Sequence, residues 1–422
     1  MKSLNIFWLT AMPVSNIINE KGISSSGGWL AAMLSLLKDN PEVAKIKIVS
    51  IAAFKEERKS IDNVEIVQIH SKKIMNGYSK NDVKKLKDEI LTFSPTIIDV
   101  QGSEFYLGNI LLDCKVSIST VITLQGLVSQ IWKKFSAELP FYSIFRYLSF
   151  KDLVTNDSLL KRQLAYKKRG ENELFILKSF SNFLGRTEWD KLHSNAINPD
   201  ATYYHCDRSL RESFYDNEWD CNNFNRYTLF TTQAHYPIKG LHVLLDALAI
   251  VKTKYKNVKL FVAGKNILSK DLLSRLKLGT YDKYLIHKIK NLGLSDNIEF
   301  TGWLNQSGLV DILKYINVFV IPSTIENSPN SLAEAQILGV PCVGSNAGGI
   351  STYVRHDVDG LLYNNNDAVE LARSIEKVFE SDELAKKFSV NAREQAKIRH
   401  NKAKNVDDLL KAYKEIIKDF KG

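Results

Sequence analysis

Two glutamates and a polar helix start in the C-terminal half of the chain have the types and spacing to bind a phosphorylated, hydroxyl-rich ligand. Glu326 lies in a polar loop after an apolar run, and Glu334 follows eight residues later within a predicted short helix. That helix is expected to begin near Asn330, with Ser331 in its first turn, so free N–H groups and a hydroxyl are available to an oxyanion. Two carboxylates flanking such a site suit a ligand with hydroxyls at both ends and phosphate in the middle, as in a nucleotide sugar. Alternatively, both glutamates are surface acids, because Glu is favoured near a helix start.

A lysine at the start of another predicted helix offers a positive charge. Lys239 precedes Gly240 and an apolar stripe at helical spacing that begins at Leu241. A cation at a helix N-terminus opposes the helix macrodipole, so helix stability does not favour it there. We interpret Lys239 as a partner for a negative group, with a solvated surface lysine as the alternative.

A glycine pair near the N-terminus offers another close approach to a ligand. Gly27 and Gly28 follow the first predicted strand and precede an apolar helical pattern. Adjacent glycines let backbone amides approach an anion or a sugar, and the helix start adds unpaired N–H groups. A tight turn that serves packing alone explains the pair equally well.

The elements that must position these residues are β-branched and aromatic runs separated by helix-length spacers. Such runs predict parallel strands joined by crossover helices, and they form two series, one before and one after the polar stretch 207–226. We therefore expect two doubly wound α/β domains, residues 1–206 and 207–404, with a C-terminal helix near 405–422 packing back on the first domain. Ligands of such sheets bind beyond the carboxyl ends of the strands, so the best pocket is expected between the domains.

Composition narrows the classes of protein. The chain has 422 residues, 44% of them hydrophobic and 25% charged, which excludes a disordered or collagen-like polymer. No apolar run reaches the roughly 20 residues needed to cross a bilayer. The four cysteines lack CxxC spacing, so neither zinc nor disulfides are expected and a reducing cytoplasm fits best. Aromatic RNA-binding motifs and zinc fingers are absent, so nucleic acid is not an expected partner despite the net charge of +10.

Half of the excess positive charge lies in one aromatic-rich segment. Residues 131–180 contain ten basic, five acidic and ten aromatic residues. Basic surfaces that carry aromatic side chains bind anionic bilayers. The segment therefore predicts an anionic membrane surface as a partner, and the alternative is a buried helical pair whose rings pack in a core.

Together these motifs resemble the retaining, GT-B-fold glycosyltransferases of family 4. The resemblance covers nearly the whole chain and implies two Rossmann-like domains that face each other across a cleft. The motifs that carry it are the E-x7-E spacing of Glu326 and Glu334, Lys239-Gly240, Gly27-Gly28, and the glycine turn at 346–350.

The resemblance also implies roles for these residues. Glu326 would hold hydroxyls of the transferred sugar, and Glu334 would hold the ribose of the nucleotide. The groups expected to neutralise the departing diphosphate are Lys239 and the backbone around Asn330, Ser331 and Leu332. Glu326 and Lys239 are thus the expected catalytic residues, and the family works without a divalent metal or another cofactor.

Two positions depart from the family pattern. The family commonly has an arginine six residues before the lysine, where this chain has Gln233, and a His-Gly in the first domain, where it has Gln125-Gly126. A neutral amide can still hydrogen-bond to the donor or to the acceptor but carries no charge, so diphosphate binding depends more heavily on Lys239.

Arg186 follows the last predicted strand of the first domain. At that place its side chain is expected to reach the cleft and touch an acceptor or a phosphate. A structural pair with Glu188 or Asp190 is the alternative.

On this resemblance, the chain is expected to transfer a sugar, with retention, from a UDP- or GDP-linked donor to a glycan or lipid-linked glycan in surface polysaccharide biosynthesis. It would be a cytoplasmic hexosyltransferase that binds peripherally to the inner face of the plasma membrane. Two alternatives stay open: a non-catalytic nucleotide-sugar-binding or scaffold protein, and a sugar-nucleotide epimerase on the same fold.

Overall fold

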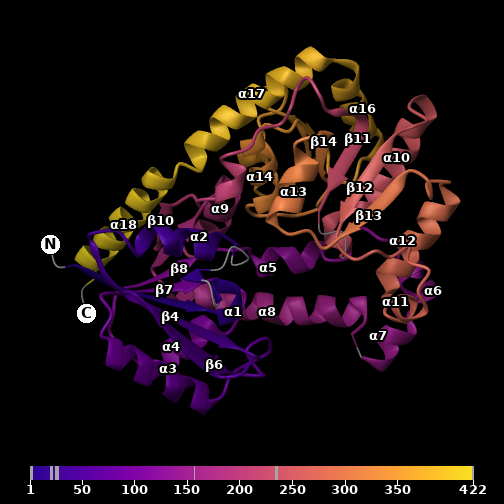
Figure 1. Cartoon of the computed structure of the whole chain (residues 1–422). Coiled ribbons are helices and arrows are strands. Elements are labelled where there is room, and N and C mark those ends of the chain that lie inside the picture. Colours follow the sequence, from indigo (N-terminus) through magenta and orange to yellow (C-terminus); the bar gives the residue numbers. More distant parts are fainter. Residues whose placement is uncertain (1–2, 20–21, 24–27, 156, 233–235, 421–422) are drawn as a thin grey trace. The chain divides into compact units, whose positions relative to one another are not determined.

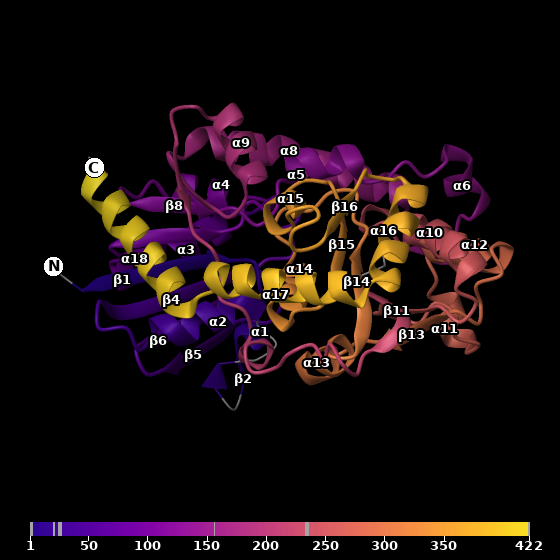
Figure 2. The same cartoon turned by 90° about the horizontal axis from the view of Figure 1, so that it is seen from above.

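The computed structural model describes residues 3–19, 22–23, 28–155, 157–232 and 236–420. The chain divides into two units, whose elements are labelled in two views (Figure 1, Figure 2). Unit 1 consists of residues 1–130, 167–211 and 399–422, and unit 2 consists of residues 131–166 and 212–398. The expected boundary at 206–207 lies close to the division at 211–212, but residues 131–166, expected in the first domain, belong to unit 2.

Unit 1 contains an eight-stranded sheet with the order β10-β9-β8-β7-β1-β4-β6-β5. All neighbouring strands pair in parallel except β5, which runs antiparallel to β6. The inner strands are largely buried on both faces, as expected for a parallel sheet covered on both sides. The strands are β1 (Leu4–Thr10), β4 (Val43–Ala52), β5 (Glu57–Ile61), β6 (Val64–His70), β7 (Ile97–Gln101), β8 (Thr120–Thr123), β9 (Asn182–Gly185) and β10 (Thr202–His205), with a separate hairpin of β2 (Ile18–Asn19) and β3 (Gly22–Ile23).

Helices pack on both faces of this sheet. One hydrophobic cluster joins the sheet to α2 and α18, and a second joins its other face to α3, α4 and α8. The helices are α1 (Val14–Ile17), α2 (Gly28–Leu37), α3 (Lys80–Phe93), α4 (Leu107–Cys114), α5 (Val128–Ile131), α8 (Leu159–Ser179, whose first turns belong to unit 2), α9 (Glu188–Ile197) and α18 (Lys402–Asp419).

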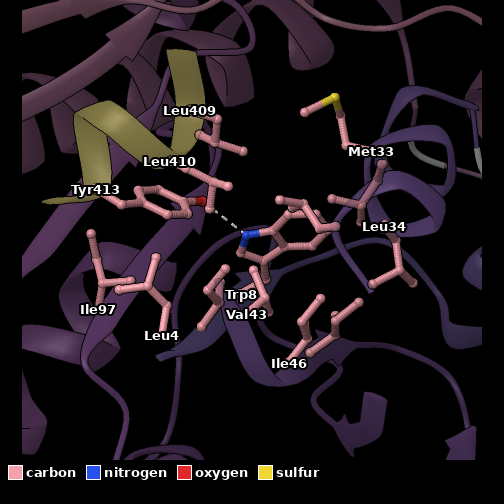
Figure 3. Close-up of a cluster of buried hydrophobic side chains, with 14 of the residues drawn as sticks. Leu4, Trp8, Met33, Leu34, Val43, Ile46, Ile97, Leu409, Leu410 and Tyr413 are labelled. Carbon is pink, nitrogen blue, oxygen red and sulfur yellow. Dashed lines mark hydrogen bonds between the residues drawn. The ribbon is translucent and has the colours of Figure 1, made fainter. Parts of the chain in front are cut away.

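The C-terminal helix α18 is part of the core of unit 1. Its Leu409, Leu410 and Tyr413 lie among side chains of the sheet and of α2 (Figure 3). Trp8 of β1 donates a hydrogen bond from Nε1 to the Tyr413 hydroxyl (3.0 Å), and this hydroxyl donates to Oδ2 of Asp99 in β7 (2.6 Å). The last helix is therefore fixed to the first unit by packing and by a buried polar chain.

Unit 2 contains a six-stranded sheet with the order β13-β12-β11-β14-β15-β16, in which every pair is parallel. Its central strand β14 is fully buried, as its apolar run at 318–321 predicts. The strands are β11 (Asn225–Thr231), β12 (Lys259–Ala263), β13 (Ile298–Gly302), β14 (Ile316–Ile321), β15 (Cys342–Ser345) and β16 (Leu361–Tyr363).

Most helices of unit 2 connect these strands, α16 and α17 follow the last strand, and two short helices come from the segment 131–166. These two are α6 (Phe141–Arg146) and α7 (Phe150–Val154). The others are α10 (Leu241–Lys254), α11 (Leu272–Leu276), α12 (Thr280–Asn291), α13 (Gln306–Leu313), α14 (Asn330–Leu338), α15 (Ile350–Tyr353), α16 (Ala368–Glu380) and α17 (Asp382–Arg399). The expectation of two doubly wound α/β domains is confirmed.

Candidate donor site at the carboxyl edge of the second sheet

The loop after β14 holds Glu326, and its carboxylate is already engaged. Lys239, from the turn after β11, forms an ion pair with Glu326 Oε1, and the hydroxyl of Ser323 donates to the same oxygen (3.1 Å). The Lys239 and Glu326 side chains are 19% and 18% exposed, so both are partly buried but reachable from solvent. The structure thus brings together the two residues expected to be catalytic.

Backbone contact holds the Lys239 turn against the Glu326 loop. Thr324 N donates to Ile238 O (2.8 Å), and Gly240 follows Lys239 with φ +70. A Cβ at Gly240 would lie 1.8 Å from Pro322 O, so a side chain cannot be placed there without moving the loop. Glycine is therefore required at this position both for its backbone conformation and for space.

A third loop, which follows β15, contacts the backbone of Glu326. Gly349 N donates to Glu326 O (2.8 Å), and a Cβ at Gly348 would lie 2.0 Å from that same oxygen. The three loops follow β11, β14 and β15, which are neighbours in the sheet. Their residues meet because the carboxyl ends of parallel strands lie along one edge.

The helix α14 begins at Asn330, directly after the loop that holds Glu326, as expected. Its N-cap residue Pro329 makes no side-chain capping bond, and the first N–H groups of a helix have no acceptor within the helix. The Leu332 amide, expected to face the diphosphate, instead donates to Pro329 O (3.1 Å), so Asn330 and Ser331 are better placed to offer amides. Glu334 is buried at 8% exposure, one turn further along the helix.

Two of the other expected site residues lie in unit 1, where hydrogen bonds hold them. Gln125 Oε1 accepts from Arg208 Nη1 (2.8 Å). Arg186 is buried, and its Nη2 donates to Leu124 O (2.8 Å), while its backbone N–H donates to Asp190 Oδ2 (3.1 Å). The structure therefore gives Arg186 a role in the fold of unit 1, and the expected acceptor contact stays a prediction.

The remaining expected site residues concern the glycine pair and the substituted arginine position. Gln233 and Gly27 lie outside the described residues. Gly28 is described and begins α2 with φ +59.

The structure adds a cavity that the sequence did not indicate. It has a volume of about 260 Å³ and lies next to the Lys239 turn, at the ends of β11, β12 and β13. The residues that follow these strands, Tyr236, Lys265 and Trp303, line it, and Trp303 is 76% exposed at its rim. Position directly after a strand was the signal that would have identified them.

The segment 131–166 also contributes residues to the lining of this cavity. Arg162 Nε donates to Asp157 Oδ1 (2.8 Å), and the bonding between the two side chains lowers the pKa of Asp157 and raises that of Arg162. Elsewhere in the lining, Lys265 Nζ lies 2.8 Å from Asp282 Oδ2. The cavity therefore combines fixed charges of both signs with aromatic rings, which suits a polar ligand that has a flat face.

Two absences concern the described part of the chain. There, no three His, Cys, Asp or Glu side chains are grouped so that they could hold a metal ion. Across the same residues, no helix has both the length and the apolar character needed to cross a membrane.

Two Rossmann-like units with parallel sheets in one chain are the architecture of the GT-B fold, and solved GT-B structures align along nearly all of it. Sucrose-phosphate synthase of Thermosynechococcus elongatus has a TM-score of 0.71 at 14% identity, covering 98% of this chain and 99% of that one. HepE of Anabaena, in complex with UDP, has a TM-score of 0.65 at 16% identity, covering 98% and 100%. At these identities the likeness shows the fold alone.

Sequence comparison narrows the class for part of the chain. Residues 222–395, which include Lys239, Glu326 and Glu334, match the family of glycosyl transferases group 1. The chain is 31% identical over 127 residues to the UDP-Gal:alpha-D-GlcNAc-diphosphoundecaprenol alpha-1,3-galactosyltransferase of Escherichia coli, covering 30% of this chain and 32% of that protein. It is 25% identical over 184 residues to the capsular polysaccharide biosynthesis glycosyltransferase CapM of Staphylococcus aureus, covering 44% and 45%. The matches thus span about a third to a half of these relatives' length.

Proposed function

We propose that the protein is a retaining glycosyltransferase that moves a sugar from a nucleotide diphosphate sugar to a glycan or lipid-linked glycan acceptor. The observation that carries the proposal is the Lys239–Glu326 pair at the carboxyl edge of the second sheet. It lies within the stretch that matches glycosyl transferases group 1. Surface polysaccharide biosynthesis is the proposed setting.

The donor would extend along this edge of the sheet. Glu326 would accept hydrogen bonds from sugar hydroxyls, Lys239 would contact the diphosphate, and Glu334 would bind the ribose. The amides of Asn330 and Ser331 would add hydrogen bonds to phosphate oxygens at the start of α14. The neighbouring cavity of about 260 Å³, with its exposed Trp303, is the proposed place of the nucleobase.

Donor binding would exchange the partners of Lys239. Without donor, the ammonium is paired with the Glu326 carboxylate. A bound diphosphate would draw the ammonium to itself and free the carboxylate for sugar hydroxyls. As the bond between the sugar and the diphosphate breaks, negative charge grows on the leaving oxygen, and a fixed cation and helix amides stabilise that charge. We propose that no divalent metal is needed for this step.

The names of similar proteins favour a uridine nucleotide over a guanosine one. The relative from Escherichia coli is named for UDP-Gal and for a diphosphoundecaprenol acceptor, and HepE was solved with UDP and with UDP-glucose. We therefore propose a UDP-sugar as the donor and a lipid-linked glycan as the acceptor, and a GDP-sugar is the alternative donor.

A nucleotide panel followed by a transfer assay tests the proposal. UDP should raise the midpoint of thermal unfolding more than GDP, because ligand that binds only the folded state stabilises it. Labelled UDP-sugar with a lipid-linked acceptor should give a glycosylated product. No stabilisation by either nucleotide would overturn the proposed donor site.

A second function is nucleotide-sugar binding without transfer. The neutral residues Gln233 and Gln125, at positions where the resembling family commonly has arginine and histidine, favour it. Stabilisation by UDP without turnover of any acceptor would support this function, and conversion of the donor into another sugar nucleotide would support an epimerase.

A further inference from the structure

The helices α6 and α7 carry large apolar side chains that point away from the core of unit 2. Phe141, Tyr142 and Phe145 of α6 and Phe150 of α7 are 67%, 65%, 55% and 72% exposed. Phe141 and Phe145 pack edge to face on each other, with ring centroids 5.0 Å apart. Among the described residues, exposed rings are thus concentrated on two short helices joined by three residues, which we name the α6–α7 patch (Figure 1).

The inner face of the same segment packs on unit 2 and is hydrogen-bonded to it. The exposed rings therefore belong to an ordered segment. Asp152 accepts hydrogen bonds from the Thr280 N–H (2.8 Å) and hydroxyl (2.6 Å) at the start of α12. His242 Nε2 of α10 lies 3.1 Å from Ala137 O. Ile144 is buried between the exposed positions of α6. The segment therefore has one face that packs on unit 2 and another that faces outward.

Within residues 141–155, the charged side chains that face outward are positive. Arg146 is exposed beside the rings, Lys151 is partly exposed, and Lys283 of α12 lies near Leu148 O at 3.4 Å. Between residues 141 and 155 the single acidic residue is Asp152, and its carboxylate points inward to Thr280. No negative side chain of this stretch therefore offsets the cations on the outer face.

We propose that the α6–α7 patch docks on an anionic phospholipid bilayer. Aromatic rings are stable at the boundary between headgroups and acyl chains, and lysine and arginine beside them attract anionic headgroups. A protein partner of neutral or basic surface would not match this charge. Lys151 and Asp152, on the same segment, also line the cavity of about 260 Å³. Docking would hold the ligand edge of unit 2 near the membrane, which bears on the lipid-linked acceptor and in that respect rests on the proposed function.

Vesicle sedimentation with the full chain tests the docking without any turnover. The protein should sediment with phosphatidylcholine vesicles that contain phosphatidylglycerol and stay in solution with phosphatidylcholine alone, and added salt should release it. The triple variant Phe141→Ser, Phe145→Ser, Phe150→Ser should bind at least tenfold more weakly. Arg146→Glu, which leaves the rings in place, should also weaken binding to the anionic vesicles.

A matched control replaces three similarly exposed apolar residues elsewhere, namely Leu91→Ser, Leu192→Ser and Val369→Ser, and should bind as the parent chain does. Circular dichroism and UDP-induced thermal stabilisation show whether each variant is folded. Equal binding to neutral vesicles, no binding at low salt, or unchanged binding by the triple variant would overturn the proposal. A dimer in solution that the triple variant dissociates would overturn it too, since the patch would then join two copies. If the parent chain binds the vesicles as expected but UDP does not stabilise it, the result would instead contradict the proposed donor site.

Discussion

Ionisable side chains of the two sheets differ in how deeply they are buried. In unit 1, Asp99 is buried, accepts from Tyr413 and from Thr123 (2.6 Å), and has a pKa that burial raises to about 6. In unit 2, Lys239 and Glu326 keep about a fifth of their side-chain surface exposed. In unit 1 the buried carboxylate holds the last helix of the chain against the sheet. In unit 2 the charged pair stays within reach of a ligand.

The comparison teaches that an ionisable side chain in an α/β sheet is not by itself a ligand site. Asp99 lies in the middle of β7 in one sheet, whereas Glu326 lies in the loop after β14 in the other. Their partners separate them. Asp99 is held by two neutral hydroxyls, of which that of Tyr413 ties α18 to the core, whereas Glu326 is held by one ammonium that a phosphate could attract away.

The largest expected effect comes from breaking the exposed pair. Glu326→Gln and Lys239→Met should each lower the rate of sugar transfer by about 100-fold, because each removes a charge that acts on the donor in the transition state. Unfolding temperatures should change little, since the pair is partly solvated. Initial rates at saturating donor measure the effect.

The matched control is Arg226→Ala, which removes an exposed ion pair with Asp382 (3.0 Å) elsewhere on unit 2. Its transfer rate should equal that of the parent chain. Normal rates in both site variants would mean that the exposed pair is as structural as Asp99, and the contrast between the two sheets would fail.

The sequence predicted the parts of the fold that depend on apolar patterning. The apolar runs predicted two series of strands around the stretch 207–226, and the observed strands form two such series, β1–β10 ending at His205 and β11–β16 beginning at Asn225. The strand β5 was missed because it lies at the sheet edge and alternates polar side chains, so no apolar run marks it. The strand β16 was missed because three residues are too short for a pattern.

The site was predictable only where its residues are close in sequence or share a motif. Glu326 and Lys239 were identified, although their ion pair joins residues 87 positions apart. The cavity residues Trp303 and Arg162 were not identified, because their proximity depends on how the segment 131–166 packs on unit 2. That packing rests on contacts such as Asp152 with Thr280, which are 128 residues apart and leave no local pattern.

A second test removes the backbone contact that positions Lys239. Gly240→Ala should destabilise unit 2 by about 3 kcal/mol and abolish donor binding, because the added Cβ meets Pro322 O and alanine disfavours positive φ. Thermal unfolding and UDP titration measure the two effects. Gly293→Ala is the control, since Gly293 has φ +63 but open space around its Cβ, and it should retain donor binding. Donor binding by Gly240→Ala equal to that of the control would contradict the steric argument.

The sealed network of unit 1 gives a smaller and different effect. Tyr413→Phe removes one hydroxyl and leaves both Trp8 Nε1 and Asp99 Oδ2 without this partner. It should destabilise unit 1 by about 2 kcal/mol, since each of the two groups left without a partner costs at least about 1 kcal/mol, while UDP binding stays normal. Hydrogen exchange of α18 and nucleotide titration separate the outcomes. Weakened UDP binding with unchanged protection of α18 would reverse the roles assigned to the two sheets.

The smallest expected effect is a loss of stability in acid, and it concerns His242, which contacts the segment 131–166. Burial lowers the pKa of His242 to about 4 from an ordinary value of 6.5. Unfolded chain therefore binds a proton that folded chain excludes, so the stability present above pH 6.5 is lost as the pH falls toward 4. One unit below 6.5, at about pH 5.5, the loss should be about 1.4 kcal/mol.

This loss should be local, because His242 contacts Ala137 O and the Tyr281 hydroxyl within unit 2. Hydrogen exchange, corrected for its intrinsic pH dependence, should show that residues 131–146 lose protection at about pH 5.5 in the parent chain. The loss of protection should be smaller in His242→Gln. The buried His400 of unit 1, whose pKa burial also lowers to about 4, serves as the internal control, because acid should loosen its surroundings equally in both proteins. Equal acid sensitivity of residues 131–146 in the two proteins would show that other groups hold this segment on unit 2. The cavity wall and the α6–α7 patch would then depend on contacts such as Asp152 with Thr280, and not on a proton.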